Sequence, residues 1–276
     1  MPRICVHLCP SVSTLALGAS ARVCGSNLEN TVTEAIIHVE SVHKSFLMGK
    51  EAVLALRGVD LDVMPGEMVC LMGPSGSGKT TLLNILGGLE DPSRGHVIVD
   101  GQNVVAMSED QLARLRLAKM GFVFQNYNLL ANFTALENVE APMALNGLRG
   151  RKRRQKAEDL LQLVGLGDRA KHYPTELSGG QQQRVAIARA LANDPDILIG
   201  DEITGDLDSV TGYEVMEIVT RLNQERGTTI VYVTHDPRMS GFATRLIQIR
   251  DGKLVSDEAN EQVSVGELQD AAQESE

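Results

Sequence analysis

The chain has 276 residues, of which 43% are apolar and 22% are charged, and its formal net charge at pH 7 is -10. This length is enough for one large domain or two small ones, and the apolar share is enough for a packed core. No window of the sequence approaches the roughly 18 uninterrupted apolar residues of a membrane-spanning helix, so any membrane role is expected to run through a partner. The negative charge argues against a nucleic-acid-binding surface over the whole protein, and we expect no nucleic-acid partner.

The first 33 residues differ in pattern from the rest of the chain. They faintly resemble a signal peptide, but polar residues interrupt their apolar stretch, so we expect a disordered extension or an over-long translation start instead of an export signal. The cysteines show neither paired C-x-x-C spacing nor a dense framework, which is typical of a reducing cytosol. They are Cys5, Cys9, Cys24 and Cys70, and we expect the last to be inert core because it lies in an apolar strand.

Strand patterns dominate the next part of the chain. Alternating apolar and polar residues predict strands in "IIHVESVHKSF" and "LRGVDLDV", and the apolar run "EMVCLMG" predicts a fully buried strand. The segments "HVIVDGQNV" and "LIQIRDGKLV" each place Asp-Gly between apolar runs, which is the strongest short hairpin signal. We therefore expect antiparallel strands beside a buried core.

Helical patterns follow. The capping box "SEDQ" predicts a short helix before the strand "GFVF", and residues from about 126 to 176 show two helical patterns and no convincing strand. The buried strands "DILIG" and "TTIVYV" resume after this insert with a helix between them, which is the alternation of an α/β domain with a mostly parallel sheet. We expect an extension at 1–33, one domain at 34–255 with a helical subdomain at about 126–190, and a solvated acidic tail at 256–276.

The segment from residue 73 to residue 81, "GPSGSGKTT", fits G-x-x-x-x-G-K-S/T and lies between a buried strand and a helix. Its glycines let successive N–H groups turn inward around phosphate oxygens, and the helix that begins near Lys79 adds its positive N-terminal end. We expect Lys79 to reach the β- and γ-phosphates, Thr80 to give its hydroxyl to Mg²⁺, and Thr81 to add further donors. The predicted nucleotide-binding residues of this loop are Gly73, Pro74, Ser75, Gly76, Ser77, Gly78, Lys79, Thr80 and Thr81.

A magnesium site needs a carboxylate at the end of a strand, and "ILIGDE" supplies two. Asp201 is predicted to hold the metal through water, and Glu202 to orient and deprotonate an attacking water molecule. Acidic pairs on a surface usually mean only solvation, but this pair closes a wholly apolar strand, which favours the catalytic interpretation.

The segment "LSGGQQQRVAIARAL" at 177–191 predicts a second phosphate site. Ser178 and Gln181 form a capping box, and Gly179 and Gly180 leave the first helical N–H groups uncovered. One γ-phosphate cannot lie at two distant helix N-termini of one compact domain. We therefore expect a head-to-tail homodimer in which each chain completes the nucleotide site of the other.

Residues 36 to about 255 resemble the ATP-binding cassette (ABC) transporter ATPases. Besides the loop, the carboxylate pair and the 177–191 segment, which look like Walker A, Walker B and the signature of that family, "FVFQNYN" looks like its Q-loop, "TGDLD" its D-loop and "VYVTHD" its switch-histidine segment. The resemblance implies an α/β P-loop NTPase fold with an antiparallel β subdomain and an α-helical insert. It also implies ATP hydrolysis with Mg²⁺ as the cofactor.

The resemblance assigns further residues that the patterns alone do not. Gln125 would contact the metal or water and relay the nucleotide state to a membrane partner, for which the helical insert would carry the docking groove. His235 would hold the γ-phosphate, and Asp208 would contact the opposite protomer. Phe46 stands where the family often has an adenine-stacking tyrosine, and it keeps the ring face without the hydroxyl.

Two further departures from the family pattern follow the carboxylate pair. Ile203 replaces the proline usual after the catalytic glutamate, and the exchange is expected to loosen the following turn. Asp206 adds a charge beside the D-loop.

The stretches "LGGLEDPSRG", "TALENVEAPM" and "IQIRDGKLV" look most like the subgroup of lipoprotein-release, macrolide-export and cell-division ATPases. This likeness implies separate transmembrane permease subunits as partners, with export or lipid-related extrusion as the work. The chain would be a peripheral subunit at the cytoplasmic face of the cell membrane. A mechanotransmission or cell-division regulatory ATPase without transport stays an alternative.

Two other interpretations fit the sequence less well. A soluble ABC ATPase of translation or DNA repair typically has tandem cassettes, zinc modules or a coiled coil, and this chain has one cassette and none of these. The basic run "RGRKRRQK" at 149–156 could bind lipid or nucleic acid, but we expect a solvated helix start.

Overall fold

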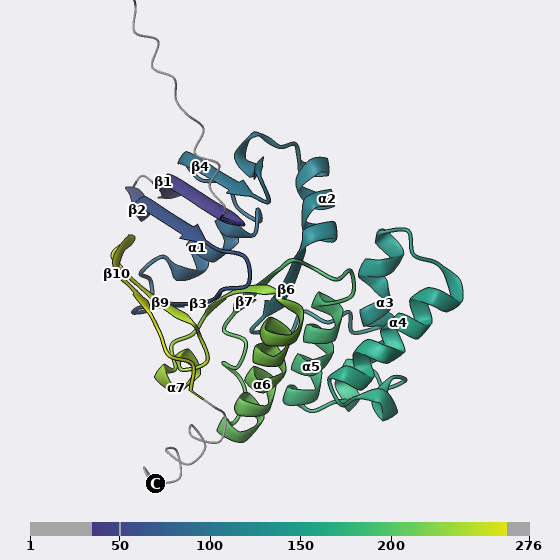
Figure 1. Ribbon diagram of the computed structural model, residues 1–276. Helices are drawn as coiled ribbons and strands as arrows, with labels where there is room; N and C mark the ends of the chain where they lie inside the picture. The colour runs from purple at the N-terminus through teal and green to yellow at the C-terminus, as the bar shows by residue number, and fades with distance from the viewer. Residues whose placement is uncertain (1–34, 50, 264–276) are drawn as a thin grey trace, which may run out of the picture. The chain divides into compact units, whose positions relative to one another are not determined.

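The computed structural model describes residues 35–49 and 51–263. A four-stranded antiparallel sheet, in the order β2-β1-β4-β5, forms one layer of the domain (Figure 1). Its strands are β1 (Ile37–Met48), β2 (Glu51–Val63), β4 (Arg94–Val99) and β5 (Gln102–Asn103). This sheet confirms the expected antiparallel subdomain, and β4 and β5 form the first of the two Asp-Gly hairpins.

A six-stranded sheet, in the order β10-β9-β3-β8-β7-β6, forms the centre of the domain. All neighbouring pairs are parallel except β9 and β10, which form the second Asp-Gly hairpin. The strands are β3 (Met68–Met72), β6 (Met120–Phe124), β7 (Ile197–Asp201), β8 (Thr229–Val233), β9 (Arg245–Arg250) and β10 (Lys253–Ala259).

Both faces of the central sheet are covered, which explains the continuous apolar runs of its strands. Successive side chains point to opposite faces of a strand, and β3 shows the result: Val69 and Leu71 pack with α1 (Lys79–Leu86) and the antiparallel sheet, whereas Met68 and Cys70 pack toward the helical side. On the helical side lie α5 (Gly179–Ala190) and α6 (Ser209–Arg226), while α3 (Ala135–Leu145) and α4 (Gly150–Leu163) pack against α5 at the side of the domain away from β10 (Figure 1).

The remaining helices are α2 (Glu109–Lys119), α7 (Pro237–Ser240) and three 3₁₀ turns, Val104–Ala106, Gly167–Arg169 and Pro174–Glu176. The capping box predicted for α2 is present, because the Ser108 N–H donates to Gln111 Oε1 at 2.9 Å. Helices α3, α4 and α5 correspond to the helical subdomain expected at about 126–190. Within the part of the chain that the structure describes, no helix has the length and apolar character needed to cross a bilayer.

The last strand continues beyond the expected domain boundary at residue 255. Strand β10 runs to Ala259, and Asp257 accepts hydrogen bonds from Arg245 Nε and Nη2 at 2.6 and 2.7 Å. These bonds raise the pKa of Arg245, so its charge is secure at any physiological pH. The start of the expected acidic tail is therefore part of the sheet. The predictions for residues 1–33 and for the end of the tail concern residues outside the described ranges.

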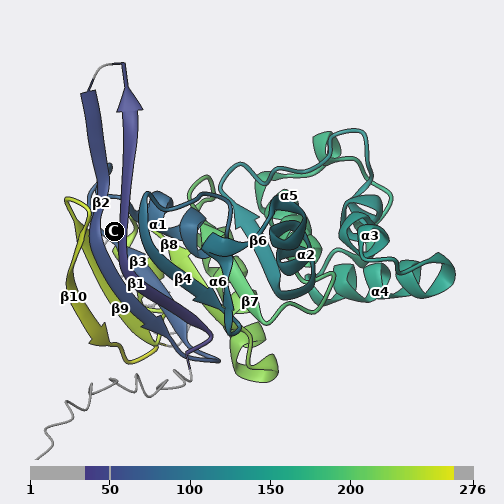
Figure 2. The ribbon, with the colours of Figure 1, turned by 90° about the horizontal axis from the view of Figure 1, so that it is seen from above.

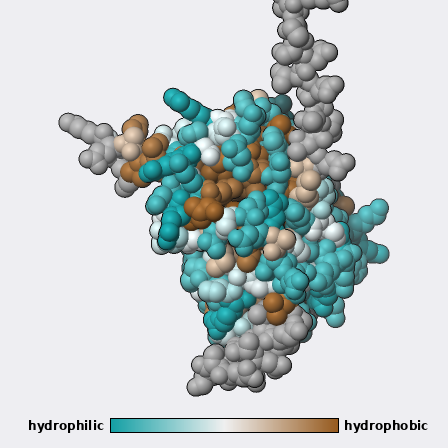
Figure 3. All heavy atoms as spheres, turned by 60° about the vertical axis from the view of Figure 1, so that its left-hand side comes forward, coloured by the Kyte–Doolittle hydropathy of each residue, from teal (hydrophilic) through white to brown (hydrophobic). Residues whose placement is uncertain are grey.

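The β1–β2 hairpin extends beyond the sheet to which it belongs (Figure 2). Its outer end, at the upper left in Figure 3, carries exposed apolar side chains, of which Leu47 is 84% exposed. Phe46 lies on this part of β1, opposite Val53 in the ladder.

Candidate functional site

The glycine-rich loop between β3 and α1 has the conformation that the sequence predicts. Gly76 and Gly78 have φ angles of 77° and 103°, in the left-handed region that favours glycine. A Cβ on Gly78 would lie 2.5 Å from the Ala55 carbonyl oxygen, and one on Gly73 would overlap the carbonyl of Ile249. The loop therefore packs against β2 and β9 so closely that side chains are excluded at these two positions.

The Lys79 ammonium group lies inside the curve of this loop. It donates to the carbonyl oxygens of Gly73 and Pro74 at 2.8 and 2.9 Å, and the residue is only 8% exposed. No carboxylate forms a salt bridge with it among the residues that the structure describes. A buried, unneutralised cation at a helix N-terminus is an arrangement that binds anions.

A cavity of about 480 Å³ opens in front of Lys79. The loop and the carboxyl ends of β7 and β8 both contribute to it. Its lining residues are Ala55, Ser75, Gly76, Gly78, Lys79, Thr80, Thr81, Glu202 and His235. The loop residues Gly73, Pro74 and Ser77 do not line it, and Ser77 is buried beneath the loop.

Thr80 and Asp201 meet at the edge of this cavity, where Thr80 Oγ1 donates to Asp201 Oδ1 at 3.2 Å. Burial raises the pKa of Asp201, while the Thr80 hydrogen bond and the Lys79 charge act in the opposite direction. A hydroxyl and a carboxylate are the hard oxygen ligands that Mg²⁺ prefers. The described residues hold no group of three or more His, Cys, Asp or Glu side chains that could bind a metal ion by themselves, so an ion bound here would need phosphate oxygens or water as its other ligands.

Glu202 and His235 form the opposite wall, with Glu202 Oε1 3.1 Å from His235 Nδ1. Glu202 has a φ angle of 48°, which is sparsely populated by residues other than glycine and costs about 1 kcal/mol or more. Its N–H donates to the Val233 carbonyl at 3.1 Å. The backbone therefore turns sharply after Asp201 and directs the second carboxylate to the cavity.

The turn after Glu202 is well packed, so the loosening expected from Ile203 is not seen. Ile203 is 2% exposed, and its carbonyl accepts a hydrogen bond from the buried side-chain amide of Gln183. Gly205 packs closely against the side chains of Glu202 and Gln125. A Cβ on Gly205 would lie 3.0 Å from Glu202 Oε2 and 3.3 Å from Gln125 Nε2. Gln125 is thus beside Glu202, and its Nε2 donates to Asp206 Oδ1 at 3.1 Å.

The second predicted phosphate site lies at the start of α5. The Ser178 N–H donates to Gln181 Oε1 at 3.1 Å, and the Gln181 N–H donates to Ser178 Oγ at 3.3 Å, so the predicted capping box is present. Gly180 packs so closely on Thr211 of α6 that a Cβ would overlap its methyl group. Asp208 caps α6 and accepts from the Thr211 N–H and hydroxyl at 3.0 and 2.7 Å, which lowers the pKa of Asp208.

The structure does not bring this second site to the Lys79 cavity. Five of its predicted residues lie outside the lining of that cavity: Ser178, Gly179, Gly180, Gln181 and Asp208. Phe46 is also absent from its lining, and the Lys44 ammonium group lies 5.1 Å from the centre of the Phe46 ring.

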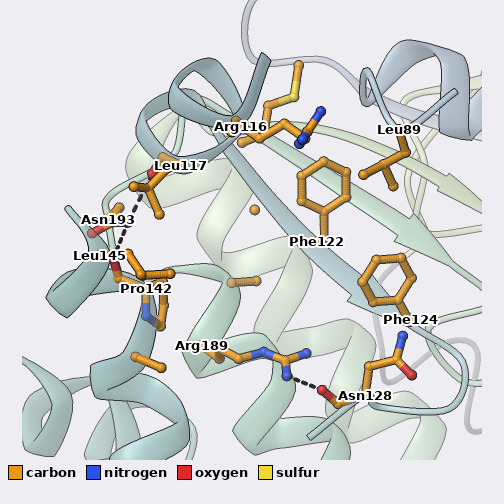
Figure 4. Close-up of a pocket in the computed structure, with 15 residues that line it drawn as sticks. Leu89, Arg116, Leu117, Phe122, Phe124, Asn128, Pro142, Leu145, Arg189 and Asn193 are labelled. Carbon is orange, nitrogen blue, oxygen red and sulfur yellow. Dashed lines mark hydrogen bonds between the residues drawn. The ribbon is translucent and has the colours of Figure 1, made fainter. Parts of the chain in front are cut away.

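A groove that sequence reasoning did not resolve into residues lies between α2, β6, α3 and α5 (Figure 4). Its volume is about 470 Å³, and Phe122 and Phe124 stack along one side with ring centres 6.1 Å apart. Leu89, Pro142 and Leu145 add apolar surface. These residues look like ordinary core in the sequence, so only the three-dimensional arrangement shows that they leave a space.

Two arginines border the groove. Arg116 donates to the Gly88 carbonyl at 2.5 Å, and Arg189 donates to the carbonyls of Tyr127 and Asn128 (Figure 4). Burial lowers the pKa of Arg189. Neither guanidinium group has a carboxylate partner within the described part of the chain.

A family model described as "ABC transporter" matches residues 56–205. The chain belongs to the ABC transporter family. It is 51% identical over 219 residues to an uncharacterized ABC transporter ATP-binding protein of Thermotoga maritima, covering 79% of this chain and 93% of that protein. It is also 51% identical over 221 residues to the macrolide export ATP-binding/permease protein MacB of Syntrophobacter fumaroxidans, of which it covers 31%.

A solved structure described as a dimeric post-hydrolysis state of the ATP-binding cassette MJ0796 bound to ADP and Pi matches with a TM-score of 0.77 and 44% identity. The match covers 81% of this chain and 98% of MJ0796, which comes from Methanocaldococcus jannaschii. These comparisons confirm the predicted family, its cassette fold, the ATPase class and the likeness to the macrolide-export subgroup. The chain spans about a third of the length of the MacB proteins that it matches.

Proposed function

We propose that this chain is the ATP-hydrolysing subunit of an ABC-type membrane transporter, in which ATP-driven closure of a dimer moves separate membrane subunits. One observation carries the proposal. A single cavity is lined by an unneutralised lysine at a helix N-terminus, by Thr80 next to Asp201, and by the Glu202–His235 pair. An anion-binding side and a proton-accepting side face one space, as hydrolysis of a phosphate anhydride requires.

Each wall of the cavity has its own part in the reaction. Lys79 and the loop N–H groups bind the β- and γ-phosphates of ATP. Thr80 and Asp201, with Gln125 nearby, hold Mg²⁺, which when bound neutralises charge on the phosphate oxygens. Glu202 orients the attacking water and accepts its proton, and His235 holds the γ-phosphate. Phe46 offers a ring face to the adenine.

The separation of the α5 N-terminus from the Lys79 cavity supports a shared site. Ser178, Gly179 and Gly180 of a second copy would complete the cavity, with Asp208 contacting the opposite protomer. The dimeric state described for MJ0796 supports this arrangement, as does its description as bound to ADP and Pi.

The groove of Figure 4 is the proposed contact for the membrane subunits. Its apolar floor suits the apolar face of a short helical segment. Two guanidinium groups without carboxylate partners favour an acidic residue on that segment, since a charge-assisted pair is stronger than the present bonds to neutral carbonyls. The likeness to the ATP-binding/permease protein MacB supports a permease partner, which would hold this chain at the cytoplasmic face of the membrane.

Two measurements test the proposal. The purified chain should hydrolyse ATP only with Mg²⁺, and substitutions of Lys79 or Glu202 should lower its turnover strongly. Affinity purification from native membranes should recover a transmembrane protein through the groove. A recovered partner without a substrate pathway would favour the mechanotransmission or cell-division alternative. A chain that hydrolyses ATP neither alone nor with its membrane partner would contradict the ATPase assignment.

A further inference from the structure

The corner that joins α3 to α4, residues 146–152, concentrates exposed positive charge. Arg149, Arg151 and Lys152 are exposed, and none of them has an ion pair or a side-chain hydrogen bond within the described residues. The next three basic residues of α4 are different, because they pair with Glu140, Glu158 and Asp194. The corner thus holds the part of the basic run that no described residue neutralises.

These cations are placed where they weaken their own helix. The positive end of the helix dipole lies at the start of α4, where acidic residues are favourable. The first turn nevertheless contains no acidic residue, and Arg151 and Lys152 follow its first residue, Gly150. The N-cap is Arg149, which makes no side-chain capping bond, although α3 and α5 each begin with a capping box. Basic residues at the start of α4 oppose the stability of this helix, whereas α3 and α5 are well capped. This difference points to a role of the basic residues outside folding.

Leu148 packs against the core, but the two glycines of the corner face open space. A Cβ on Gly147 or Gly150 would meet no atom within 4 Å. The views in Figures 1 and 2 both place α3 and α4 at the end of the domain away from β10. Leu145, the residue before the corner, lines the groove and is 78% exposed, so the corner begins where the groove ends.

We propose that the α3–α4 corner binds the anionic headgroups of a phospholipid membrane, beside the partner docked in the groove. The position of the corner beside a membrane rests on the proposed function. The attraction to anionic headgroups rests only on the charges of the corner. Each Lys or Arg near an anionic bilayer strengthens binding about 5-fold. The whole chain has a net charge of -10 and would be repelled by such a surface. The positively charged corner is attracted instead, so it orients the domain with this corner toward the membrane.

The shape and composition of the corner favour a lipid surface over other anions. The segment 145–156 contains no aromatic residue that could stack on a nucleotide base. None of the three cations lines any of the cavities described above, so nothing encloses a small anion. Exposed cations at one end of the domain fit a plane of mobile headgroups.

Vesicle co-sedimentation of the purified chain, without nucleotide and in low-salt buffer, tests the proposal. We compare vesicles of phosphatidylcholine with vesicles that also contain phosphatidylglycerol. The test variant carries Arg149→Gln, Arg151→Gln and Lys152→Gln. The control variant carries Arg221→Gln, Arg226→Gln and Lys253→Gln, which removes the same charge at exposed residues of α6 and β10.

The unchanged chain should bind only the anionic vesicles, and added salt should weaken this binding. The test variant should bind on the order of 100-fold more weakly, and the control variant should bind far better than the test variant. The test variant should melt no lower than the unchanged chain, since it removes cations from the positive end of a helix. Two results would overturn the proposal. One is equally strong binding to vesicles with and without phosphatidylglycerol, and the other is an equal loss of binding in the test and control variants.

Hydrolysis of ATP measured without vesicles keeps this proposal separate from the proposed function. Both variants should hydrolyse ATP at the rate of the unchanged chain, because the changed residues lie outside the cavity. Loss of vesicle binding with full hydrolysis supports the headgroup site. A chain that hydrolyses ATP but never binds anionic vesicles refutes the site and leaves the proposed function intact.

Discussion

His235 Nδ1 lies 3.1 Å from Glu202 Oε1, although 33 positions separate the two residues in the chain. The contact follows from the register of the central sheet. Asp201 at the end of β7 lies opposite Val233 at the end of β8, so the residues that come next leave the same carboxyl edge. In parallel α/β sheets this edge is where ligands bind. The pair joins the proposed base to the proposed phosphate-binding ring.

Glu202→Gln should trap the ATP-bound dimer. Glutamine keeps the shape of the side chain and can still hydrogen-bond a water molecule, but it cannot accept a proton, so hydrolysis should slow by about 10²-fold or more. ATP binding should survive, and the dimer should accumulate with ATP and Mg²⁺. Sizing chromatography with and without ATP measures this. Hydrolysis at the parent rate would overturn the role of Glu202.

Ser178→Arg in the Glu202→Gln background is the matched test of the shared site. The new side chain adds bulk at the start of α5, where Ser178 is exposed and lies outside the Lys79 cavity of its own chain. The variant should stay folded but remain a monomer with ATP. A double variant that still dimerises with ATP would remove the α5 N-terminus from the interface.

His235→Ala should separate binding from turnover. The ring is 64% exposed, so its removal leaves no buried cavity, and the loop that binds the other phosphates is unchanged. We expect hydrolysis to fall by about 10²-fold with ATP affinity changed far less. His96→Ala, an exposed histidine on β4, is the control and should behave as the parent. Equal turnover in both variants would place His235 outside the reaction.

Lys79→Ala should weaken nucleotide binding. It removes the one lysine or arginine among the described residues that line the cavity. A hydrogen bond to a charged group contributes about 1.5–3 kcal/mol, so we expect affinity to fall about 10- to 100-fold. Titration with a fluorescent ATP analogue measures it. Lys171→Ala, at an exposed lysine outside the cavity, is the control. Unchanged affinity and turnover in Lys79→Ala would contradict the loop assignment.

The sequence predicts the loop and the carboxylate pair at the end of β7 well, for a physical reason. Both depend on local patterns, since a glycine-rich turn after an apolar strand has few conformations and residues that follow a buried parallel strand leave the sheet at its carboxyl edge. The role of His235 comes from the family resemblance, and its contact with Glu202 comes from the structure. Contacts between distant segments are different. Gln125 and Asp206 are 81 positions apart, and only the fold reveals that the added charge of Asp206 holds the Gln125 amide.

The same limit applies to the turn after Glu202 and to the groove. Ile203 suggests a loose turn when it is compared with proline, but the buried Gln183 amide, 20 positions away, bonds to its carbonyl. Phe122 and Phe124 read as ordinary strand residues, and only the spacing between β6 and α3 leaves their rings beside a groove. Packing across elements decides both features.

Cys70 should be inert in the native protein. Burial in the core raises the pKa of its thiol to about 12, so the reactive thiolate is nearly absent at neutral pH. Iodoacetamide should leave Cys70 unmodified at pH 8 and label it only in denaturant, as peptide mass spectrometry would show. Labelling of Cys70 in the folded chain would contradict its burial.

The same shift predicts a loss of stability in alkali. The folded pKa is higher than the unfolded value near 9.0, so the contribution of Cys70 is complete below pH 9 and is lost as the pH rises toward 12. Cys70→Val removes the titrating group and should flatten this part of the stability profile. Identical profiles for the two proteins from pH 9 to 11 would show that the thiol does not contribute.

Leu145→Asp should separate the chain from its membrane partner without impairing its own chemistry. Leu145 is 78% exposed at the end of α3 and lines the groove, so the change costs the fold little but places a negative charge where an apolar, acidic segment is proposed to dock. We expect hydrolysis by the isolated chain to be unchanged and recovery of the membrane partner from native membranes to fall at least 10-fold, the scale of one lost apolar contact plus a like-charge repulsion. Val255→Asp is the matched control, because Val255 is 57% exposed on β10, outside the groove. Equal recovery with both variants would move the docking site away from the groove, whereas loss with both would show that added charge alone, at any exposed apolar residue, prevents assembly.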